Sequence, residues 1–433
     1  MFESSTKEES LDIAIDIFKI AKEMAPFYRQ KYRDIDHIES YEDWLRVPFL
    51  TRDELYKNTF PRTEDMLTRE LKGVLITSTG GSSGMARYGV LTYEEYSKFI
   101  TVQVDALRSI GIDSDDTIAN LFVAGNLWPS FFSLAQVIEQ IGATHLPISA
   151  NIEVERILKY IVEFEPTVLL SLPTVFIFLA DLIIDGGIDA GYVRSIAYAG
   201  EHMSSMTQSH IQKAFPNAAI HSLGYTSADC GLMGYQCPEC SSLEYHVPSS
   251  FQLIEIYNFD EDRVCKVGES GEVVVTNLAR SSLPIIRYRI GDIARFKESR
   301  CSCGDTNPIL ILEGRAGEDF KLGGAYISMD TVEDSMSSYV STDGISANYQ
   351  LTIEDIDQNK MRVTLQIESS DIESSSSHIE VITSSLKQSI NELKVGEELG
   401  YLSTVVTFVD MGTIERSPIT GKIKHLQDLR AKE

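Results

Sequence analysis

Hydrophobic residues recur along the chain with two different spacings, and these spacings predict where helices and strands lie. Near the N-terminus, Leu11, Ile15, Phe18 and Ala21 are three or four residues apart, which places them on one face of a helix. After residue 71, short apolar runs alternate with helix-like stretches, a pattern typical of a parallel sheet with crossover helices. The predicted strands of that sheet are 117–123, 168–172, 195–198 and 219–222.

The pattern changes twice more toward the C-terminus. Between residues 251 and 277 hydrophobic residues alternate with polar ones, which predicts an antiparallel section. After Arg315 we expect a helix over 331–340, a strand over 361–367, a helix over 382–393 that begins at a capping box of Ser377 and Glu380, and a closing strand over 405–409. The predicted fold class is therefore a large α/β N-terminal domain with parallel sheets, helices and an antiparallel section (1–315), followed by a small α+β C-terminal domain (316–433).

Composition and charge narrow the class of protein. The chain of 433 residues is 43% hydrophobic and 24% charged, as expected of a folded globular protein. Its 64 acidic and 38 basic residues give a net charge of -26, which disfavours nucleic acid and anionic membranes as partners. The start of the chain does not resemble a secretory signal, and no run of 18 apolar residues occurs, so we expect a cytoplasmic protein.

A loop rich in glycine and hydroxyl side chains follows a further strand candidate, the apolar run Gly73–Ile76. The segment Thr77–Arg87 exposes backbone N–H groups and short donors that can surround phosphate oxygens, although the ending of a Walker A loop is absent. Alone, the segment could equally be a flexible surface loop. The predicted phosphate-binding residues are Ser78, Thr79, Gly80, Gly81, Ser82, Ser83, Gly84 and Arg87.

Further motifs follow this loop in a fixed order. They are Ala199-Gly200-Glu201, Tyr225–Gly231, Arg287–Asp292, Gly314-Arg315 and Arg416–Lys422. Together with the loop, they resemble the adenylate-forming superfamily of acyl-CoA synthetases, nonribosomal peptide adenylation domains and luciferases. Within it, Ala25–Arg29, Pro48–Leu55 and Cys301–Asp305 make the chain most similar to the phenylacetate-CoA ligase family, and the resemblance covers nearly the whole chain.

The resemblance implies a carboxylate–thiol ligase that forms AMP. Such an enzyme uses ATP and Mg²⁺ to convert an organic acid, here expected to be aromatic, into an acyl-adenylate. The acyl group then passes to coenzyme A, or alternatively to the phosphopantetheine of an acyl carrier protein. Because Met85 stands where the family commonly has a lysine, a nucleotide-binding homologue without turnover is a third interpretation.

The resemblance also assigns roles to individual residues. Lys422 would stabilise negative charge on the phosphate oxygens as the carboxylate attacks, and would therefore be catalytic. Asp229 would help to hold Mg²⁺, which prefers oxygen ligands. A displaced hinge is expected at Gly317 and Glu318. The residues expected around adenine and ribose are Gly200, Glu201, Ser222, Gly224, Tyr225, Asp292 and Arg315.

Four of the six cysteines form two close pairs. Cys237 and Cys240 are separated by two residues, and Cys301 and Cys303 by one. Four thiolates at such spacings suit tetrahedral Zn²⁺, so we predict a structural zinc site in which His246 could replace one thiolate. Chance proximity of thiols is the alternative.

The acid pocket is less well specified. Trp128, Phe131 and Tyr198 lie where the family lines its acyl site, and aromatic walls would suit a planar ring. Each of them could equally be an ordinary core residue. A small carboxylic acid is the expected partner, and the protein is expected to be a monomer or a homodimer.

Overall fold

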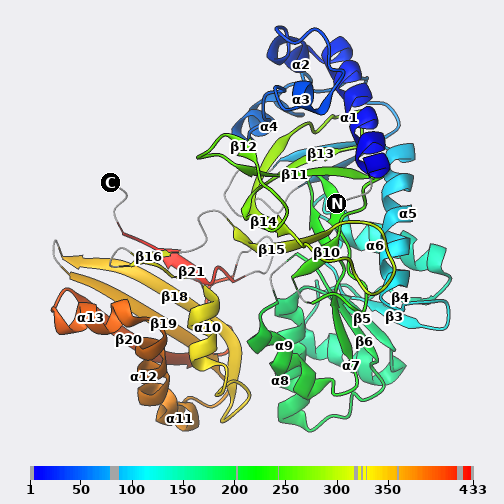
Figure 1. The fold of residues 1–433 in the computed structure, drawn as a ribbon. Helices are drawn as coiled ribbons and strands as arrows, with labels where there is room; N and C mark the ends of the chain where they lie inside the picture. The colour runs from blue at the N-terminus through cyan, green and yellow to red at the C-terminus, as the bar shows by residue number, and fades with distance from the viewer. Residues whose placement is uncertain are drawn as a thin grey trace.

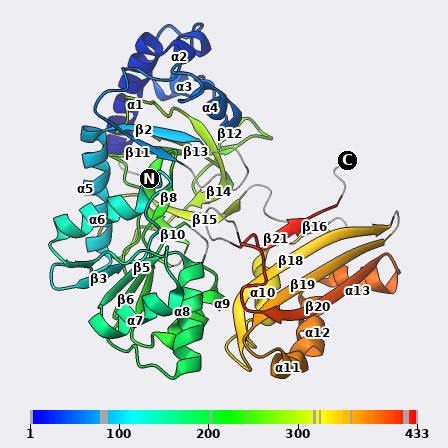
Figure 2. The ribbon, with the colours of Figure 1, turned by 180° about the vertical axis from the view of Figure 1, so that it is seen from behind.

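The computed structural model describes residues 4–78, 87–200, 203–241, 243–315, 320–322, 325–327, 329–357, 360–416 and 423–430. These residues form a large body and a smaller unit that lies beside helices α8 (Pro173–Gly186) and α9 (Ser205–Ala214) of the large body (Figure 1 and, from behind, Figure 2). The large body combines a parallel sheet, helices and an antiparallel sheet. The predicted fold class is therefore confirmed.

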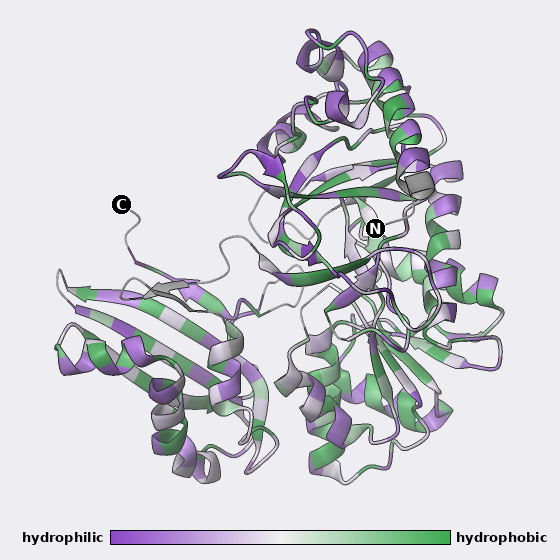
Figure 3. Cartoon of the chain, viewed as in Figure 1, coloured by the Kyte–Doolittle hydropathy of each residue, from purple (hydrophilic) through white to green (hydrophobic). Residues whose placement is uncertain are grey.

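The parallel sheet has the strand order β4-β3-β5-β6-β7. All residues of β5 and β6 are buried, which explains why these runs are apolar without alternation; Figure 3 shows hydrophobic colour along them. Four strands coincide with the predicted runs, whereas β4 was not predicted. The strands are β3 (Thr117–Asn120), β4 (Thr144–Leu146), β5 (Val168–Ser171), β6 (Ser195–Tyr198) and β7 (Ala219–Ser222). Besides α8 and α9, the nearby helices are α5 (Tyr93–Ser109), α6 (Ser130–Ile141) and α7 (Val154–Phe164).

The antiparallel sheet has the order β10-β15-β14-β13-β11-β12. Its β11 and β13 pair from Gln252 opposite Asn277 to Tyr257 opposite Glu272, as the alternation over 251–277 predicts. The strands are β10 (Glu244–His246), β11 (Gln252–Asn258), β12 (Arg263–Val264), β13 (Gly271–Asn277), β14 (Tyr288–Phe296) and β15 (Ile309–Arg315). Two two-stranded ribbons accompany it: β1 (Val74–Ser78) with β2 (Tyr88–Thr92), and β8 (Tyr225–Ser227) with β9 (Gly231–Gly234). A further ribbon, β16 (Phe320–Leu322) with β17 (Ala325–Ile327), follows β15 in the chain.

The N-terminal helices pack against this antiparallel sheet. Phe18 and Ala21 are buried in the same core cluster as Ile254 and Val275, which confirms the predicted helix and its apolar face. The helices are α1 (Ser4–Met24), α2 (Pro26–Lys31), α3 (Tyr41–Trp44) and α4 (Arg52–Asn58).

The smaller unit has a four-stranded sheet in the order β20-β19-β18-β21. Leu351, Leu365, Leu386 and Phe408 belong to its core. The division after Arg315 stays a prediction, and residues 316–319 lie outside the described part. The elements are α10 (Met329–Met336), β18 (Ile345–Asp357), β19 (Lys360–Ser369), α11 (Ile372–Ser375), the 3₁₀ turn η1 (Ser376–His378), α12 (Ile379–Ser389), α13 (Asn391–Glu398), β20 (Leu402–Asp410) and β21 (Leu426–Asp428).

Two details of the predicted helix over 382–393 are wrong. The segment is two helices, because Ile390 leaves the helical conformation with φ -119° and ψ 89°. The capping box of Ser377 and Glu380 does not form, since the Ser377 hydroxyl donates to the carbonyl of Ser374 instead. The cap lies earlier, where the Asp371 carboxylate accepts from the N–H of Ser374 at 3.1 Å.

None of the described helices is long and apolar enough to span a membrane.

Candidate active site

The glycine-rich loop begins at the end of β1, in the ribbon that β1 forms with β2. Ser78, the last residue of β1, is buried, and its N–H donates to the carbonyl of Leu127 at 2.9 Å. This bond joins the predicted phosphate loop to the segment that carries Trp128. The other loop residues assigned to phosphate, Thr79 to Gly84, lie outside the described part of the chain, so their role stays a prediction.

Arg87 emerges from the loop and forms an ion pair with Asp229. Two nitrogens of the guanidinium donate to Asp229 Oδ2 at 2.9 and 2.6 Å, and both side chains are about nine-tenths buried. Burial acts to lower the pKa of Arg87, but the hydrogen bonds and charge of Asp229 outweigh it and raise that pKa. The structure therefore brings the predicted phosphate-binding cation and the predicted magnesium-binding carboxylate into direct contact.

Tyr288 and Arg280, two residues without an assigned role in the sequence prediction, complete the surroundings of Asp229. The Tyr288 hydroxyl donates to Asp229 Oδ2 at 3.4 Å, and Arg280 donates to the Asp229 carbonyl at 2.9 Å. Burial lowers the pKa of Arg280, and among the described residues its Nη2 has no hydrogen-bond partner. Arg280 lies in an ordinary loop sequence, so no motif could have indicated it.

Three of the residues predicted around ribose and adenine lie close together. The Tyr225 hydroxyl donates to Asp292 Oδ2 at 2.5 Å, which joins β8 to β14 of the antiparallel sheet. Asp292 lies opposite Arg315 in the pairing of β14 with β15. The structure thus brings Tyr225, Asp292 and the backbone of Arg315 together, as the predicted site requires.

Gly224 shapes the turn between Ser222 and Tyr225. Its φ of +139° is a conformation that residues with a side chain rarely adopt. A Cβ at this position would approach Leu232 Cδ1 to 2.5 Å and the Gly234 carbonyl to 2.6 Å. The Ser222 hydroxyl accepts from the Gly224 N–H at 3.1 Å. Only glycine therefore fits between β7 and the β8–β9 ribbon.

Besides the phosphate loop, several predicted site residues lack a described position or side chain. Glu201, Gly317, Glu318 and Lys422 lie outside the described residues, and only the backbone of Arg315 is placed. Gly200 is exposed directly after β6, with a φ of +83°. Their assigned roles stay predictions.

The aromatic residues predicted for the acid pocket separate into two environments. Tyr198 ends β6 and is buried in a core cluster with Phe176 and Met203; burial raises the pKa of its hydroxyl. Phe131 and Trp128 are half-buried, and Phe131 packs on the cluster that contains Ile100. Tyr198 ends β6, and Trp128 and Phe131 follow β3, so all three lie toward the carboxyl edge of the parallel sheet, where ligands of open α/β sheets bind.

The cysteine cluster joins the segment before β10 to the segment before β15. Cys237 Sγ lies 3.6 Å from the sulfurs of both Cys240 and Cys301. A tetrahedral ion with Zn–S bonds of 2.3 Å separates its sulfur ligands by about 3.8 Å, so this spacing fits zinc. The donors that lie within 4.8 Å of one another are Cys237, Cys240, His246 and Cys301. His246 therefore belongs to the group, as the sequence allowed.

Polar neighbours orient the ring of His246. Its Nδ1 lies 3.3 Å from the carbonyl of Asn307 and 3.8 Å from Asp305 Oδ2, while Nε2 lies 3.5 Å from Cys303 Sγ. A proton on Nδ1 directed at the carbonyl leaves the Nε2 lone pair facing the sulfurs, which is the usual arrangement around a histidine ligand of a metal. Cys303 is exposed and contacts His246, but it does not belong to the four donors that all lie within 4.8 Å of one another.

The chain resembles known proteins along nearly its full length. No family model matches it. It is 22% identical over 424 residues to a phenylacetate-coenzyme A ligase of Pseudomonas putida, a match that covers 95% of this chain and 91% of that protein. A structure of 2-hydroxyisobutyryl-CoA ligase in the postadenylation state with 2-HIB-AMP superimposes with a TM-score of 0.81 at 19% identity, covering 99% of this chain and 90% of that one. For the same ligase with 2-HIB-AMP and CoA in the thioesterification state, the TM-score is 0.68 at 18% identity, covering 99% and 91%.

The chain therefore has the fold of a coenzyme A ligase that forms an acyl-adenylate, and its sequence is similar to the phenylacetate-coenzyme A ligases. Both findings agree with the predicted resemblance.

Proposed function

We propose that this protein is an AMP-forming ligase that activates an aromatic carboxylic acid and transfers the acyl group to coenzyme A. The main support for the proposal is that one segment, residues 222–229, contacts two of the predicted site residues. Through Tyr225 it binds Asp292, the predicted ribose residue, and through Asp229 it binds Arg87, the predicted phosphate residue. One segment of eight residues therefore contacts both the residue proposed for ribose and the residue proposed for phosphate. The similarity to coenzyme A ligases supports the same class of enzyme.

In the first half-reaction, a carboxylate oxygen of the acid attacks the α-phosphorus of ATP and pyrophosphate leaves. Asp229 is the candidate ligand for Mg²⁺, and Arg87, released from it, would then hold phosphate oxygens. Lys422 is the candidate for stabilising the charge that develops on the attacked phosphate.

In the second half-reaction, a thiolate attacks the acyl carbon and AMP leaves. Free coenzyme A is the proposed acceptor because the similar proteins are named as coenzyme A ligases. A carrier-protein phosphopantetheine presents the same thiol and is the alternative. We propose that the small domain, residues 316–433, rotates near Gly317 and Glu318 between the two steps.

An aromatic acid is proposed because aromatic side chains lie at the carboxyl edge of the parallel sheet. Trp128 and Phe131 are half-buried and follow Leu127, which Ser78 contacts, whereas Tyr198 is buried at the end of β6 and would form the floor of such a pocket. The name of the Pseudomonas putida relative points to the same class of acid.

The experiment that tests this function is ATP–pyrophosphate exchange with a panel of aryl and short aliphatic acids. Exchange that depends on an added acid and falls at least about a hundredfold in Lys422→Ala supports the ligase. If the protein binds nucleotide but no acid supports exchange, the result would favour a homologue without turnover. That alternative is suggested by Met85, which stands in place of a loop lysine.

We also propose a structural zinc ion, held by Cys237, Cys240, His246 and Cys301. The support is the sulfur spacing and the orientation of the imidazole described above. The ion would join the chain before β10 to the chain before β15 and supply no step of the reaction. The oligomeric state and a cytoplasmic location stay predictions.

A further inference from the structure

The smaller unit contacts the large body through one surface of helices α8 and α9. Ile177 of α8 and Met206 of α9 are buried in the core cluster of the smaller unit, together with Met336 and Tyr349. Lys213 of α9 donates to the carbonyl of Val340 at 2.9 Å. Apolar and polar contacts therefore fix the smaller unit on these two helices.

A buried carboxylate of the smaller unit holds Arg416, the first residue of the lysine motif. Glu368 is fully buried, and its two oxygens accept from two nitrogens of Arg416 at 3.0 and 2.7 Å. Glu368 also accepts from the N–H of Ile414 at 3.0 Å. Such a two-point pair fixes the plane of the guanidinium as well as its position.

Arg416 also marks one end of the segment that contains Lys422. Its backbone pairs with Ile423 in an antiparallel bridge. Lys422 is bonded directly to Ile423 in the sequence, so the position of this bridge limits where the lysine can reach. Whatever fixes Arg416 relative to the large body therefore also restricts the position of the proposed catalytic group.

Phe178 of α8 makes that link to the large body. The Arg416 guanidinium carbon lies 4.7 Å from the centre of the Phe178 ring, within the range of a cation–π contact. The ring is half-buried. Arg416 is thus held on one side by its own unit and on the other side by the large body.

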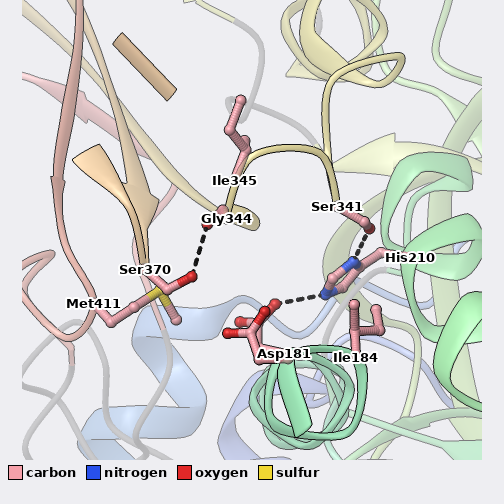
Figure 4. Close-up of a pocket in the computed structure, with 9 residues that line it drawn as sticks. Asp181, Ile184, His210, Ser341, Gly344, Ile345, Ser370 and Met411 are labelled. Atoms are coloured by element: carbon pink, nitrogen blue, oxygen red, sulfur yellow. Dashed lines mark hydrogen bonds and ion pairs between the residues drawn. The ribbon is translucent and has the colours of Figure 1, made fainter. Parts of the chain in front are cut away.

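A polar cluster lies one helical turn beyond Phe178. Asp181 of α8 binds His210 Nε2 at 2.8 Å and accepts from the Ser346 hydroxyl at 3.0 Å. The other ring nitrogen of His210 contacts the hydroxyl of Ser341, so that side chains of both units meet around a small cavity (Figure 4). This cluster fixes the same orientation of the smaller unit as the contact of Phe178 with Arg416.

The place of Phe178 on its helix connects this contact to the site. Helix α8 starts at Pro173, just after β5, at the edge of the sheet where the neighbouring strand β6 ends at Tyr198 and Gly200 follows. Phe178 is five residues further on, which corresponds to about 8 Å along the helix axis. Arg416 is therefore held close to the edge at which the acid and nucleotide are proposed to bind.

We propose that Phe178 and Arg416 are positioning residues for the adenylation step. Their stacking, supported by Glu368 and by the cluster of Asp181 and His210, holds the smaller unit in the orientation that presents Lys422 to the α-phosphate. The inference rests on the proposed function. It predicts that loss of the Phe178 ring impairs the first half-reaction and spares the second, which needs the lysine withdrawn.

The test compares Phe178→Ala, Phe178→Tyr and the matched control Phe164→Ala, an exposed phenylalanine at the end of α7. The first half-reaction is measured as pyrophosphate exchange with phenylacetate, or with the acid of the panel that wild type activates best. The second is measured as thioester formation from the synthetic adenylate of the same acid. We expect Phe178→Ala to lower kcat of exchange about tenfold with KM for ATP unchanged, and thioester formation to stay within about twofold. Phe178→Tyr and Phe164→Ala should behave as wild type.

Equal losses in both half-reactions, or unchanged exchange in Phe178→Ala, would overturn the inference. If no acid of the panel supports pyrophosphate exchange by the wild-type protein, the proposed function fails. Small-angle X-ray scattering then tests the positioning contact alone. The double variant Phe178→Ala/Asp181→Ala is compared with wild type and with Phe164→Ala. A larger radius of gyration for the double variant supports the contact, whereas equal radii contradict it.

Discussion

Arg87 and Asp229 neutralise each other in a buried ion pair, with Arg87 Nη2 2.6 Å from Asp229 Oδ2. The sequence assigns one of them to phosphate and the other to magnesium. The pair leaves neither charge buried alone. If the two residues hold phosphate and magnesium as proposed, binding of Mg-ATP would exchange this pair for two new ones.

Removal of the guanidinium should therefore cost stability. Arg87→Ala leaves the Asp229 carboxylate buried without its cation, and we expect the free energy of unfolding in urea to fall by about 3 kcal/mol. The double variant Arg87→Ala/Asp229→Asn, in which the carboxylate becomes a neutral amide of similar shape, should recover part of this loss. If the single and the double variant unfold at the same urea concentration, the pair does not contribute in this way.

Gly224 should tolerate no side chain. In Gly224→Ala the new methyl group would overlap Leu232 and the Gly234 carbonyl, and we expect a loss of about 3 kcal/mol or more in the free energy of unfolding. Gly111→Ala is the matched control, because Gly111 also has a positive φ but no atom within 4 Å of the added Cβ. The control should lose only about 1 kcal/mol. Equal thermal shifts in the two variants would contradict the proposed overlap.

Glu95 should make stability depend on pH in the acid range. Its carboxylate accepts from the Ser282 hydroxyl at 2.5 Å, from the N–H of Thr92 directly before α5, and from the N–H groups of Ser281 and Ser282, both at 2.8 Å. Burial acts to raise the pKa of Glu95, but these hydrogen bonds outweigh it and lower the pKa below 4.5.

A lowered pKa in the folded state means that the contribution of Glu95 is present above pH 4.5 and is lost as the pH falls through the folded value. Glu95→Gln should cost about 1–3 kcal/mol at pH 7 and progressively less below pH 4.5, measured by urea unfolding at each pH. A difference from wild type that stays constant down to the lowest pH at which both variants fold would show that the charge is not responsible.

The cysteine cluster should bind one zinc ion per chain, and the structure distinguishes its members. We expect Cys237→Ser and His246→Ala to lose the ion, because both residues belong to the group of four donors. Cys303→Ser should keep it, because Cys303 is exposed and does not belong to that group. Metal content measured by atomic emission and the melting temperature with and without a chelator check this. Loss of the ion in Cys303→Ser, with His246→Ala retaining it, would assign the fourth position to the thiol.

The sequence predicted the buried strands well, because a strand covered on both faces leaves a plain apolar run. All four residues of β5 and of β6 are buried, and both runs were located correctly. Strand β18 was missed since its buried positions include the polar residues Asn348 and Gln350. The break at Ile390 was missed because its hydrophobic spacing continues that of a helix.

The candidate site was predicted as a set of residues but not as a set of contacts. Motifs located Tyr225, Asp229 and Asp292, and the structure joins Tyr225 to Asp292 by a hydrogen bond. No local pattern could show that Arg87 pairs with a residue 142 positions away, or that Arg416 stacks on Phe178. Such partners depend on the packing of distant segments, and only the fold supplies that packing.

The most direct measurement of the central claim follows an oxygen atom. If the acid attacks the α-phosphorus of ATP and a thiol then displaces AMP, one carboxylate oxygen must leave with the nucleotide. An acid labelled with ¹⁸O in its carboxylate, incubated with the protein, Mg-ATP and coenzyme A, should give AMP that carries one ¹⁸O by mass spectrometry. Thioester formed with unlabelled AMP, or with ADP and labelled inorganic phosphate, would contradict an acyl-adenylate intermediate.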